Sequence, residues 1–274
     1  MCIRDSPMQM PNPIDGITAD EAKRLKGVFC DIDDTLTWEG RLVPEAFAAL
    51  ARLQACGLRV IPITGRPAGW VDHIARMWPV DGVVGENGGL WFFMSDGKLQ
   101  RRFLQSPEER NANRTRLDEA ASAILDAVPG TALASDQPYR ELDLAVDFCE
   151  DVPPLPNEAI DRIVEGFSSV GATCKVSSIH VNGWFGDFDK AKGCERFLRE
   201  RFSEELADNL DRYAFFGDSA NDEPLFATFG LSIGVANVRE FLPRMKTAPR
   251  FITQKNGGHG FAEGIDRILS LRGH

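Results

Sequence analysis

The run Val-Phe-Cys-Asp-Ile-Asp-Asp-Thr-Leu-Thr, which spans residues 28–37, decides the fold class of this chain. Its first residues are apolar and β-prone, as in a buried strand, and the acidic residues that follow mark the end of that strand. In an open α/β sheet, ligands bind at the carboxyl ends of the strands. Two carboxylates placed there, Asp31 and Asp33, are costly unless a cation or a reaction uses them. One can attack an electrophile while the other moves a proton, and a divalent metal ion can hold the pair together.

A simpler interpretation of the same stretch is a turn, in which Asp33, Asp34 and Thr35 cap the next helix. A string this short has little specificity by itself. The choice between the two interpretations therefore depends on whether further chemistry-bearing motifs follow at the ends of other predicted strands.

Length, composition and charge bound the class of protein. The 274 residues allow one large domain or two medium ones, and 43% hydrophobic and 26% charged residues are ordinary for a globular protein. With a formal net charge of -10, the surface is a poor match for nucleic acid or for an anionic membrane, and we expect neither as a partner. The six cysteines are scattered without a Cys-x-x-Cys pair, which argues against a zinc site and favours a cytoplasmic location.

The chain shows no apolar run long enough to span a bilayer and no signal-peptide pattern near its start. The first six residues match none of the later patterns, so we leave them out of the fold argument and take Met8 or Met10 as an alternative start. Cys30 lies beside Asp31, but strand alternation turns it away, and we interpret it as core packing.

Repeated βα units at both ends of the chain predict an α/β fold, a Rossmann-like parallel sheet made from residues 1–87 and 186–274. Amphipathic spacing predicts a helix over 44–55. The other elements expected in the first part are strands over 28–32, 58–63 and 82–85. In the second part we expect helices over 190–201, 221–228 and 260–271, with strands over 213–216, 231–235 and 250–253.

The block between these parts, residues 88–185, has a different character and predicts an inserted α+β cap domain. The dipeptide Asp96-Gly97 between two alternating runs indicates a β-hairpin over 90–104. The further elements expected are helices over 107–128 and 158–168, and strands over 142–148, 174–178 and 180–184.

Two motifs after the first acidic run have residues suited to binding an anion. Thr64 ends an apolar strand, and a phosphate there can accept hydrogen bonds from its hydroxyl and from the Gly65 N–H. A plain helix cap explains the same threonine. Lys190 and Lys192 open the helix after the insert, where a cation is unfavourable unless an anion lies nearby. Surface lysines in solvent are the alternative.

The run Phe-Phe-Gly-Asp-Ser-Ala-Asn-Asp over residues 215–222 is the second strong signal. Asp218 and Asp222, four residues apart just after a buried strand, are placed to face one metal ion. In this interpretation Asp218 coordinates the ion, while Asn221 and Asp222 orient the ligands around it. Capping by Ser219 or Asn221 explains one polar residue, but not two acids and a glycine.

These four motifs, in this order on alternating βα units, resemble the haloacid dehalogenase superfamily of phosphohydrolases. Only a few residues separate Thr37 from the helix at Pro44, so the insert after Thr64 is the cap. That layout is similar to class IIB, which includes Cof-type, sucrose-phosphate, trehalose-phosphate and mannosyl-3-phosphoglycerate phosphatases and phosphomannomutase. The stretches 64–66, 86–89 and 257–260 are also similar to that group.

The resemblance implies that Asp31 attacks phosphorus and that Asp33 protonates the leaving alkoxide and then activates water. It implies Mg²⁺ held by Asp31, Asp218 and the backbone carbonyl of Asp33, with Asp222 supporting. It also implies that Thr64, Gly65 and a lysine bind the phosphoryl oxygens, and we choose Lys192 because Gly193 follows it. The expected activity is Mg²⁺-dependent hydrolysis of a small phosphomonoester. A phosphomutase on the same scaffold, or a phospho-receiver without enzymatic activity, is the alternative.

A polar face in the insert points to the substrate class. Ser178, His180 and Asn182 alternate with apolar residues, so they share one strand face, and Arg140 precedes the neighbouring strand. Such a face suits sugar hydroxyls, and we expect a phosphorylated sugar or sugar acid as the small-molecule partner. A strand face in solvent is the alternative.

Overall fold

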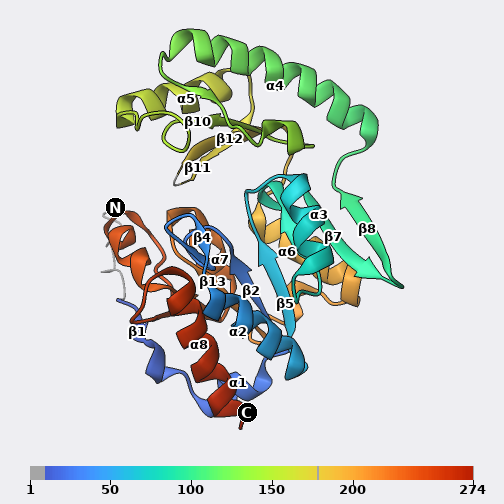
Figure 1. Ribbon diagram of the computed structural model, residues 1–274, viewed down its shortest axis with the longest axis vertical. Coiled ribbons are helices and arrows are strands. Elements are labelled where there is room, and N and C mark those ends of the chain that lie inside the picture. Colours follow the sequence, from blue (N-terminus) through green and yellow to red (C-terminus); the bar gives the residue numbers. More distant parts are fainter. Residues whose placement is uncertain (1–9, 178, 274) are drawn as a thin grey trace, which may run out of the picture.

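The computed structural model describes residues 10–177 and 179–273, and it consists of a large core with a smaller domain above it (Figure 1). A nine-stranded sheet forms the centre of the core, in the order β1-β15-β14-β13-β2-β5-β6-β7-β8. The first seven strands in this order are parallel to one another, and the last two, β7 and β8, add an antiparallel edge. In that order, the strands are β1 (Asn12–Pro13), β15 (Phe251–Ile252), β14 (Leu231–Gly234), β13 (Tyr213–Gly217), β2 (Gly27–Asp31), β5 (Arg59–Ile63), β6 (Val83–Gly85), β7 (Leu90–Ser95) and β8 (Lys98–Phe103).

Helices cover both faces of this sheet, as a parallel sheet requires. One face packs against α1 (Ala19–Arg24), α2 (Pro44–Ala55), α3 (Ala68–Met77) and α8 (Gly257–Arg272). The other packs against α6 (Lys190–Phe202) and α7 (Glu223–Thr228). Alternate residues of β2 divide between the two layers: Val28 and Cys30 face the first, and Phe29 faces the second. The expectation that Cys30 is core packing is confirmed.

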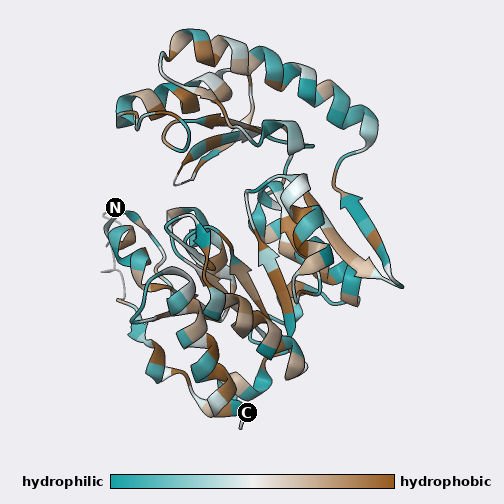
Figure 2. Cartoon of the chain, in the orientation of Figure 1, coloured by the Kyte–Doolittle hydropathy of each residue, from teal (hydrophilic) through white to brown (hydrophobic). Residues whose placement is uncertain are grey.

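The smaller domain is a four-stranded antiparallel sheet in the order β11-β12-β10-β9, with two helices on its outer face (Figure 1). Its core is formed by Leu144, Val146 and Val181 against the inner faces of the helices. The helix α4 is hydrophilic over much of its length, since only one side is covered (Figure 2). The elements are α4 (Pro107–Ala127), β9 (Ala132–Leu133), β10 (Leu144–Asp147), α5 (Asn157–Ser169), β11 (Thr173–Val176) and β12 (His180–Trp184).

The hairpin over 90–104 forms as predicted but belongs to the core and not to the insert. The chain reverses in a short turn, Glu86–Gly88, where Gly88 has a φ of +101°, and β7 then pairs with β6. Four consecutive buried side chains of β7, from Leu90 to Phe93, alternate between the two helix layers that cover the core sheet. The small domain therefore starts after Phe103 and not at residue 88. A further hairpin, β3 (Thr37–Trp38) with β4 (Arg41–Leu42), follows the first acidic run. In the described part of the chain, no helix is long and apolar enough to cross a membrane.

Candidate active site

Three acidic or hydroxyl residues meet at one edge of the core sheet because their strands are neighbours. Asp31 is the last residue of β2, Thr64 follows β5, and Asp218 follows β13. The order β13-β2-β5 places these three strands side by side with their carboxyl ends together. The topology thus joins motifs that lie far apart in the sequence at the edge where open α/β sheets bind ligands.

Asp31, Asp218 and Asp222 form a buried carboxylate cluster. One oxygen from each lies within 4.8 Å of the others. Asp222 has no exposed surface, and its Oδ2 accepts a hydrogen bond of 3.1 Å from the backbone N–H of Asp218. The Lys190 ammonium donates to Asp31 Oδ1 at 2.9 Å and to Asp222 Oδ1 at 2.8 Å. The site thus contains three carboxylates and one ammonium.

The charges of this cluster do not balance without a further cation. Burial, together with the Asp222 and Asp33 carboxylates, raises the pKa of Asp31 to about 7 despite the nearby Lys190 ammonium. Burial and the Asp222, Asp31 and Asp34 carboxylates hold the pKa of Asp218 well above its usual range. Burial lowers the pKa of Lys190, but Asp222 and Asp31 outweigh this and raise it. Buried carboxylate oxygens in excess over cations are the ligands that a divalent hard cation prefers, so the residues fit such an ion.

Lys190, and not Lys192, lies at the cluster, which corrects the choice made from the sequence. Asp189 caps α6, and its side chain accepts a hydrogen bond of 2.9 Å from Lys192 N. Lys190 opens the helix toward the strand ends and is buried. Lys192 follows two residues later, which is a rotation of about 200° around the helix axis, so it points away from the strand ends. Its side chain is exposed and pairs with Asp187. Because residues two apart on a helix point in nearly opposite directions, the sequence already implied that only one of the two lysines can face the strand ends.

Gly193 has a packing role instead of marking a phosphate lysine. A Cβ built on it would lie 2.6 Å from the Cα of Gly88 and 2.8 Å from Cγ1 of Val84. Likewise, a Cβ on Gly88 would lie 2.0 Å from the backbone oxygen of Asp189. The absence of side chains at both glycines lets α6 approach the turn after β6, and this approach positions Lys190.

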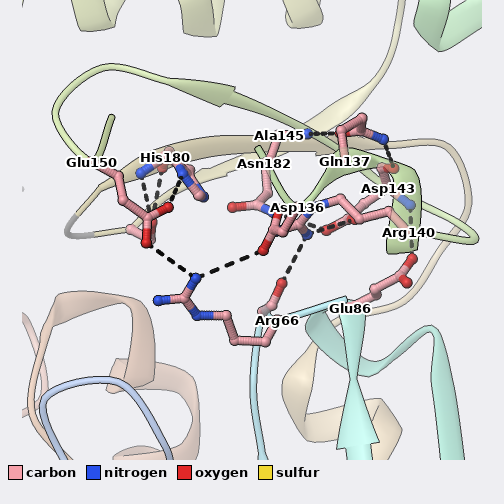
Figure 3. A network of polar contacts seen from close by, with 12 residues as sticks. Arg66, Glu86, Asp136, Gln137, Arg140, Asp143, Ala145, Glu150, His180 and Asn182 are labelled. Carbon is pink, nitrogen blue, oxygen red and sulfur yellow. Dashed lines mark hydrogen bonds and ion pairs between the residues drawn. The ribbon is translucent and has the colours of Figure 1, made fainter. Parts of the chain in front are cut away.

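Asp33 is held by Arg66. The sequence predicted no separate role for Arg66, although it lies in the stretch 64–66. Arg66 donates to Asp33 Oδ1 from Nη2 at 2.9 Å, and its Nε lies 3.1 Å from both carboxylate oxygens. From the same guanidinium, Nη1 reaches the small domain, 3.3 Å from Glu150 Oε1 and 3.7 Å from Asp136 Oδ2 (Figure 3). The guanidinium also lies 4.6 Å from the ring centroid of Trp70. Arg66 thus connects the acid–base candidate of the core with the small domain.

Thr64 and Gly65 lie beside this arginine. The Thr64 hydroxyl accepts a hydrogen bond of 2.9 Å from Arg66 N and is fully buried. Gly65 lines the cavity above Asp31, and its carbonyl accepts a hydrogen bond of 3.0 Å from Arg140 Nη1. The helix that follows is capped by Pro67 without a side-chain hydrogen bond, so Thr64 is not its cap.

Two residues for which the sequence predicted no role in the site form hydrogen bonds with Asp218. Thr35 Oγ1 donates to Asp218 Oδ1 at 3.4 Å, and Asn237 Nδ2 donates to Asp218 Oδ2 at 3.4 Å. Asn237 Oδ1 also accepts a hydrogen bond of 2.9 Å from the backbone N–H of Gly257. No sequence pattern marks Asn237, because a short 3-10 helix after β14, Ala236–Glu240, brings it here. Ser219 and Asn221 both line the cavity, and their side chains bond to each other at 3.1 Å.

The polar residues expected on the insert line the same cavity, from above. His180 Nε2 lies 2.8 Å from Glu150 Oε2, and Asn182 Nδ2 donates to Asp143 Oδ2 at 2.9 Å. Arg140 is held by Asp136 and Asp143 and is buried (Figure 3). Hydrogen bonding from His180, with Arg66 nearby, lowers the pKa of Glu150 to about 2. Ser178 lies outside the described residues.

Glu86, which the sequence argument did not select, ties the small domain to the core. Its fully buried carboxylate accepts hydrogen bonds from the backbone N–H of Ala68 at 2.8 Å, of Leu142 at 2.6 Å and of Asp143 at 3.1 Å. Burial and the Asp143 carboxylate raise the pKa of Glu86 to about 7. One side chain of the core therefore holds the backbone of the small domain in place just before β10.

A family model and relatives of known name match most of this chain. A family model for haloacid dehalogenase-like hydrolases matches residues 28–109 and 155–265. The phosphoglycolate phosphatase of Methanothrix thermoacetophila is 28% identical over 251 residues, covering 89% of this chain and 97% of that protein. The phosphoglycolate phosphatase of Archaeoglobus fulgidus is 27% identical, covering 90% and 98% of the two chains.

Solved structures share the fold at lower identity. The sucrose-phosphatase of Synechocystis sp. PCC6803, in complex with sucrose and phosphate, superimposes with a TM-score of 0.63 at 16% identity, covering 89% of this chain and 98% of that one. The C-terminal domain of C. albicans trehalose-6-phosphate phosphatase gives a TM-score of 0.71 at 12% identity, covering 97% and 99%. The predicted α/β class, a Rossmann-like core with an inserted cap, is confirmed.

Proposed function

Since this chain belongs to the haloacid dehalogenase-like hydrolase family and is a phosphatase, we propose that it hydrolyses a small phosphomonoester, with Mg²⁺, through an aspartyl-phosphate on Asp31. The observation that carries this proposal is the buried cluster of Asp31, Asp218 and Asp222 around the Lys190 ammonium. Phosphoryl transfer needs positioning and charge neutralisation more than covalent chemistry, and this cluster supplies both.

The carboxylate of Asp31 is the proposed nucleophile because it ends the central strand β2 and lines the cavity under the cap. Lys190, in contact with Asp31 Oδ1, is placed to neutralise the phosphoryl oxygens as they approach. Gly65 lines the cavity and is proposed to donate its N–H to the same group, while Thr64, which precedes it, is fully buried. Mg²⁺ held by the side chains of Asp31, Asp218 and Asp222 and by the Asp33 carbonyl would neutralise the developing negative charge.

Asp33 is the proposed general acid and base, and Arg66 positions its carboxylate. The Nε and Nη2 groups of the guanidinium both contact the Asp33 carboxylate, and this pairing fixes the direction in which the carboxylate points. In the first half of the proposed reaction Asp33 gives a proton to the leaving alkoxide, and in the second half it takes one from the attacking water.

The substrate is proposed to be the phosphate ester of a sugar or a sugar acid. The cavity between core and cap has polar side chains on its cap side, including His180, Asn182 and Arg140, and these suit hydroxyl or carboxylate groups. The curated relatives are phosphoglycolate phosphatases, which act on a small phosphorylated acid, and the structural relatives include sugar phosphatases.

The test is phosphate release from a panel of phosphorylated metabolites, with Mg²⁺ and with EDTA. We expect release from at least one sugar or sugar-acid phosphate, no release in EDTA, and a loss of several orders of magnitude in kcat for Asp31→Asn. Asp187→Asn, which changes an exposed acid near the cap, is the matched control. Full activity of Asp31→Asn would show that the nucleophile is another group.

A further inference from the structure

The cations that line the cavity differ in whether a carboxylate of the protein already neutralises them. Arg66, Arg140 and Lys190 each lie in ion pairs of 2.8 to 2.9 Å with at least one acidic side chain. Lys175 lines the same cavity, and across residues 10–177 and 179–273 no acidic side chain pairs with it. The pairs are Asp33 and Glu150 for Arg66, Asp136 and Asp143 for Arg140, and Asp31 and Asp222 for Lys190.

The strand register places Lys175 on the face of the cap sheet that lines the cavity. Lys175 on β11 is the register partner of Asn182 on β12, so both side chains leave the cap sheet on the same face. That face carries His180 two residues before Asn182, and all three line the cavity that contains Asp31. Lys175 also lines a small adjoining pocket with Lys190 and Asn221, so it overhangs the core from the cap side.

We propose that Lys175 determines specificity, and that the preferred substrate carries a carboxylate at the end opposite the phosphate. This inference rests on the proposed function, since it takes the phosphate end to lie between Asp31 and Lys190. The other cavity cations are paired with carboxylates of the protein, and Lys190 is assigned to the phosphate end, so Lys175 supplies the charge available to a second anionic group of the substrate. A neutral sugar offers this exposed ammonium only the neutral hydrogen bonds that water already gives it, whereas a carboxylate gives it a charge-assisted hydrogen bond.

Asn182 adds a second element of recognition beside the carboxylate. Its amide nitrogen is used in the 2.9 Å hydrogen bond to Asp143, so its amide oxygen remains to accept a hydrogen bond from a hydroxyl. A phosphorylated hydroxy acid fits the two groups together, with the carboxylate at Lys175 and a hydroxyl at Asn182.

The experiment compares substrates that differ only in the carboxylate. Suitable pairs are 2-phosphoglycolate with ethylene glycol phosphate, 3-phosphoglycerate with glycerol phosphate, and 6-phosphogluconate with glucitol 6-phosphate. In the wild type, we expect the acid of at least one pair to have the higher kcat/KM. In Lys175→Met that preference falls about 10- to 100-fold, mainly through KM, as for the loss of a hydrogen bond to a charged group. Lys175→Arg keeps most of it, and Lys98→Met, on the exposed β7–β8 turn, leaves it unchanged.

A binding measurement separates this inference from the proposed function. Calorimetric titration of the same pairs into Asp31→Asn, with and without Lys175→Met, reports the preference for the acid without turnover. If the wild type releases phosphate but never favours the acid, or if Lys175→Met weakens both members of a pair equally, the role of Lys175 is refuted and the phosphatase stands. If no compound is hydrolysed, the proposed function fails, and the binding preference alone then upholds or overturns the role of Lys175.

Discussion

Replacing Gly193 by alanine tests whether the packing of α6 positions Lys190. The added Cβ would lie 2.6 Å from Gly88 Cα, whereas nonbonded carbon atoms rest at about 3.5–4.0 Å. Because the obstacle is backbone, no rotamer change relieves it, and the start of α6 must move by about 1 Å. Such a shift stretches the Lys190 contacts of 2.9 and 2.8 Å with Asp31 and Asp222 beyond good hydrogen-bond geometry.

We therefore expect Gly193→Ala to lower kcat/KM by about 100-fold, as a misplacement of this size does elsewhere. The fold survives, since overpacking costs about 1–3 kcal/mol and the better helix propensity of alanine returns about 1 kcal/mol. Steady-state rates with p-nitrophenyl phosphate and thermal unfolding measure the two effects. The control is Gly97→Ala, where φ is +71° and the added Cβ meets no atom within 4 Å, so backbone strain is its main cost. Wild-type kcat/KM and melting temperature in Gly193→Ala would refute the reasoning.

Lys190→Met should lower kcat by orders of magnitude while Lys192→Met stays within about twofold, and the reverse result would restore the choice made from the sequence. Asp33→Asn should lower kcat about 10²–10⁴-fold yet keep the rise in melting temperature on adding Mg²⁺, and loss of that rise would give its side chain a metal role. Burial raises the pKa values of Asp31 and Asp218, so the folded state holds their protons longer than the unfolded state. Without metal, stability should then fall as the pH rises from about 4 to about 7, and Mg²⁺ should raise the melting temperature more at about pH 8 than at about pH 5.5. A pH-independent effect of Mg²⁺ in thermal unfolding would contradict this.

Local sequence determined the core elements and the acidic ends of their strands. A strand buried on both faces must be apolar along its length, so the runs before Asp31 and Asp218 stand out against the polar residues that follow. Helix α2 covers residues 44–55 as predicted, because its apolar spacing and the proline at its start are local signals. Since parallel strands present their carboxyl ends at one edge, the meeting of Asp31, Thr64 and Asp218 also followed from the sequence.

The sheet to which the hairpin over 90–104 belongs was decided by tertiary structure. Its turn signal and alternation are the same in either domain, but the reversal after β6 leaves β7 beside the core edge. The choice between Lys190 and Lys192 is similar. Both lysines lie near the start of α6, and only the direction of the helix relative to the strand ends makes one buried and the other exposed.

Contacts between the two domains depended on tertiary structure most of all. Arg66 meets Glu150, and Glu86 meets the backbone at Leu142, across separations of 84 and 56 residues. No local pattern encodes such pairs, because each partner taken alone is an ordinary polar residue of a loop or strand end. The sequence therefore determined which chemical groups line the edge of the core sheet. Folding the insert back over that edge decided which of the cations there are paired with carboxylates of the protein.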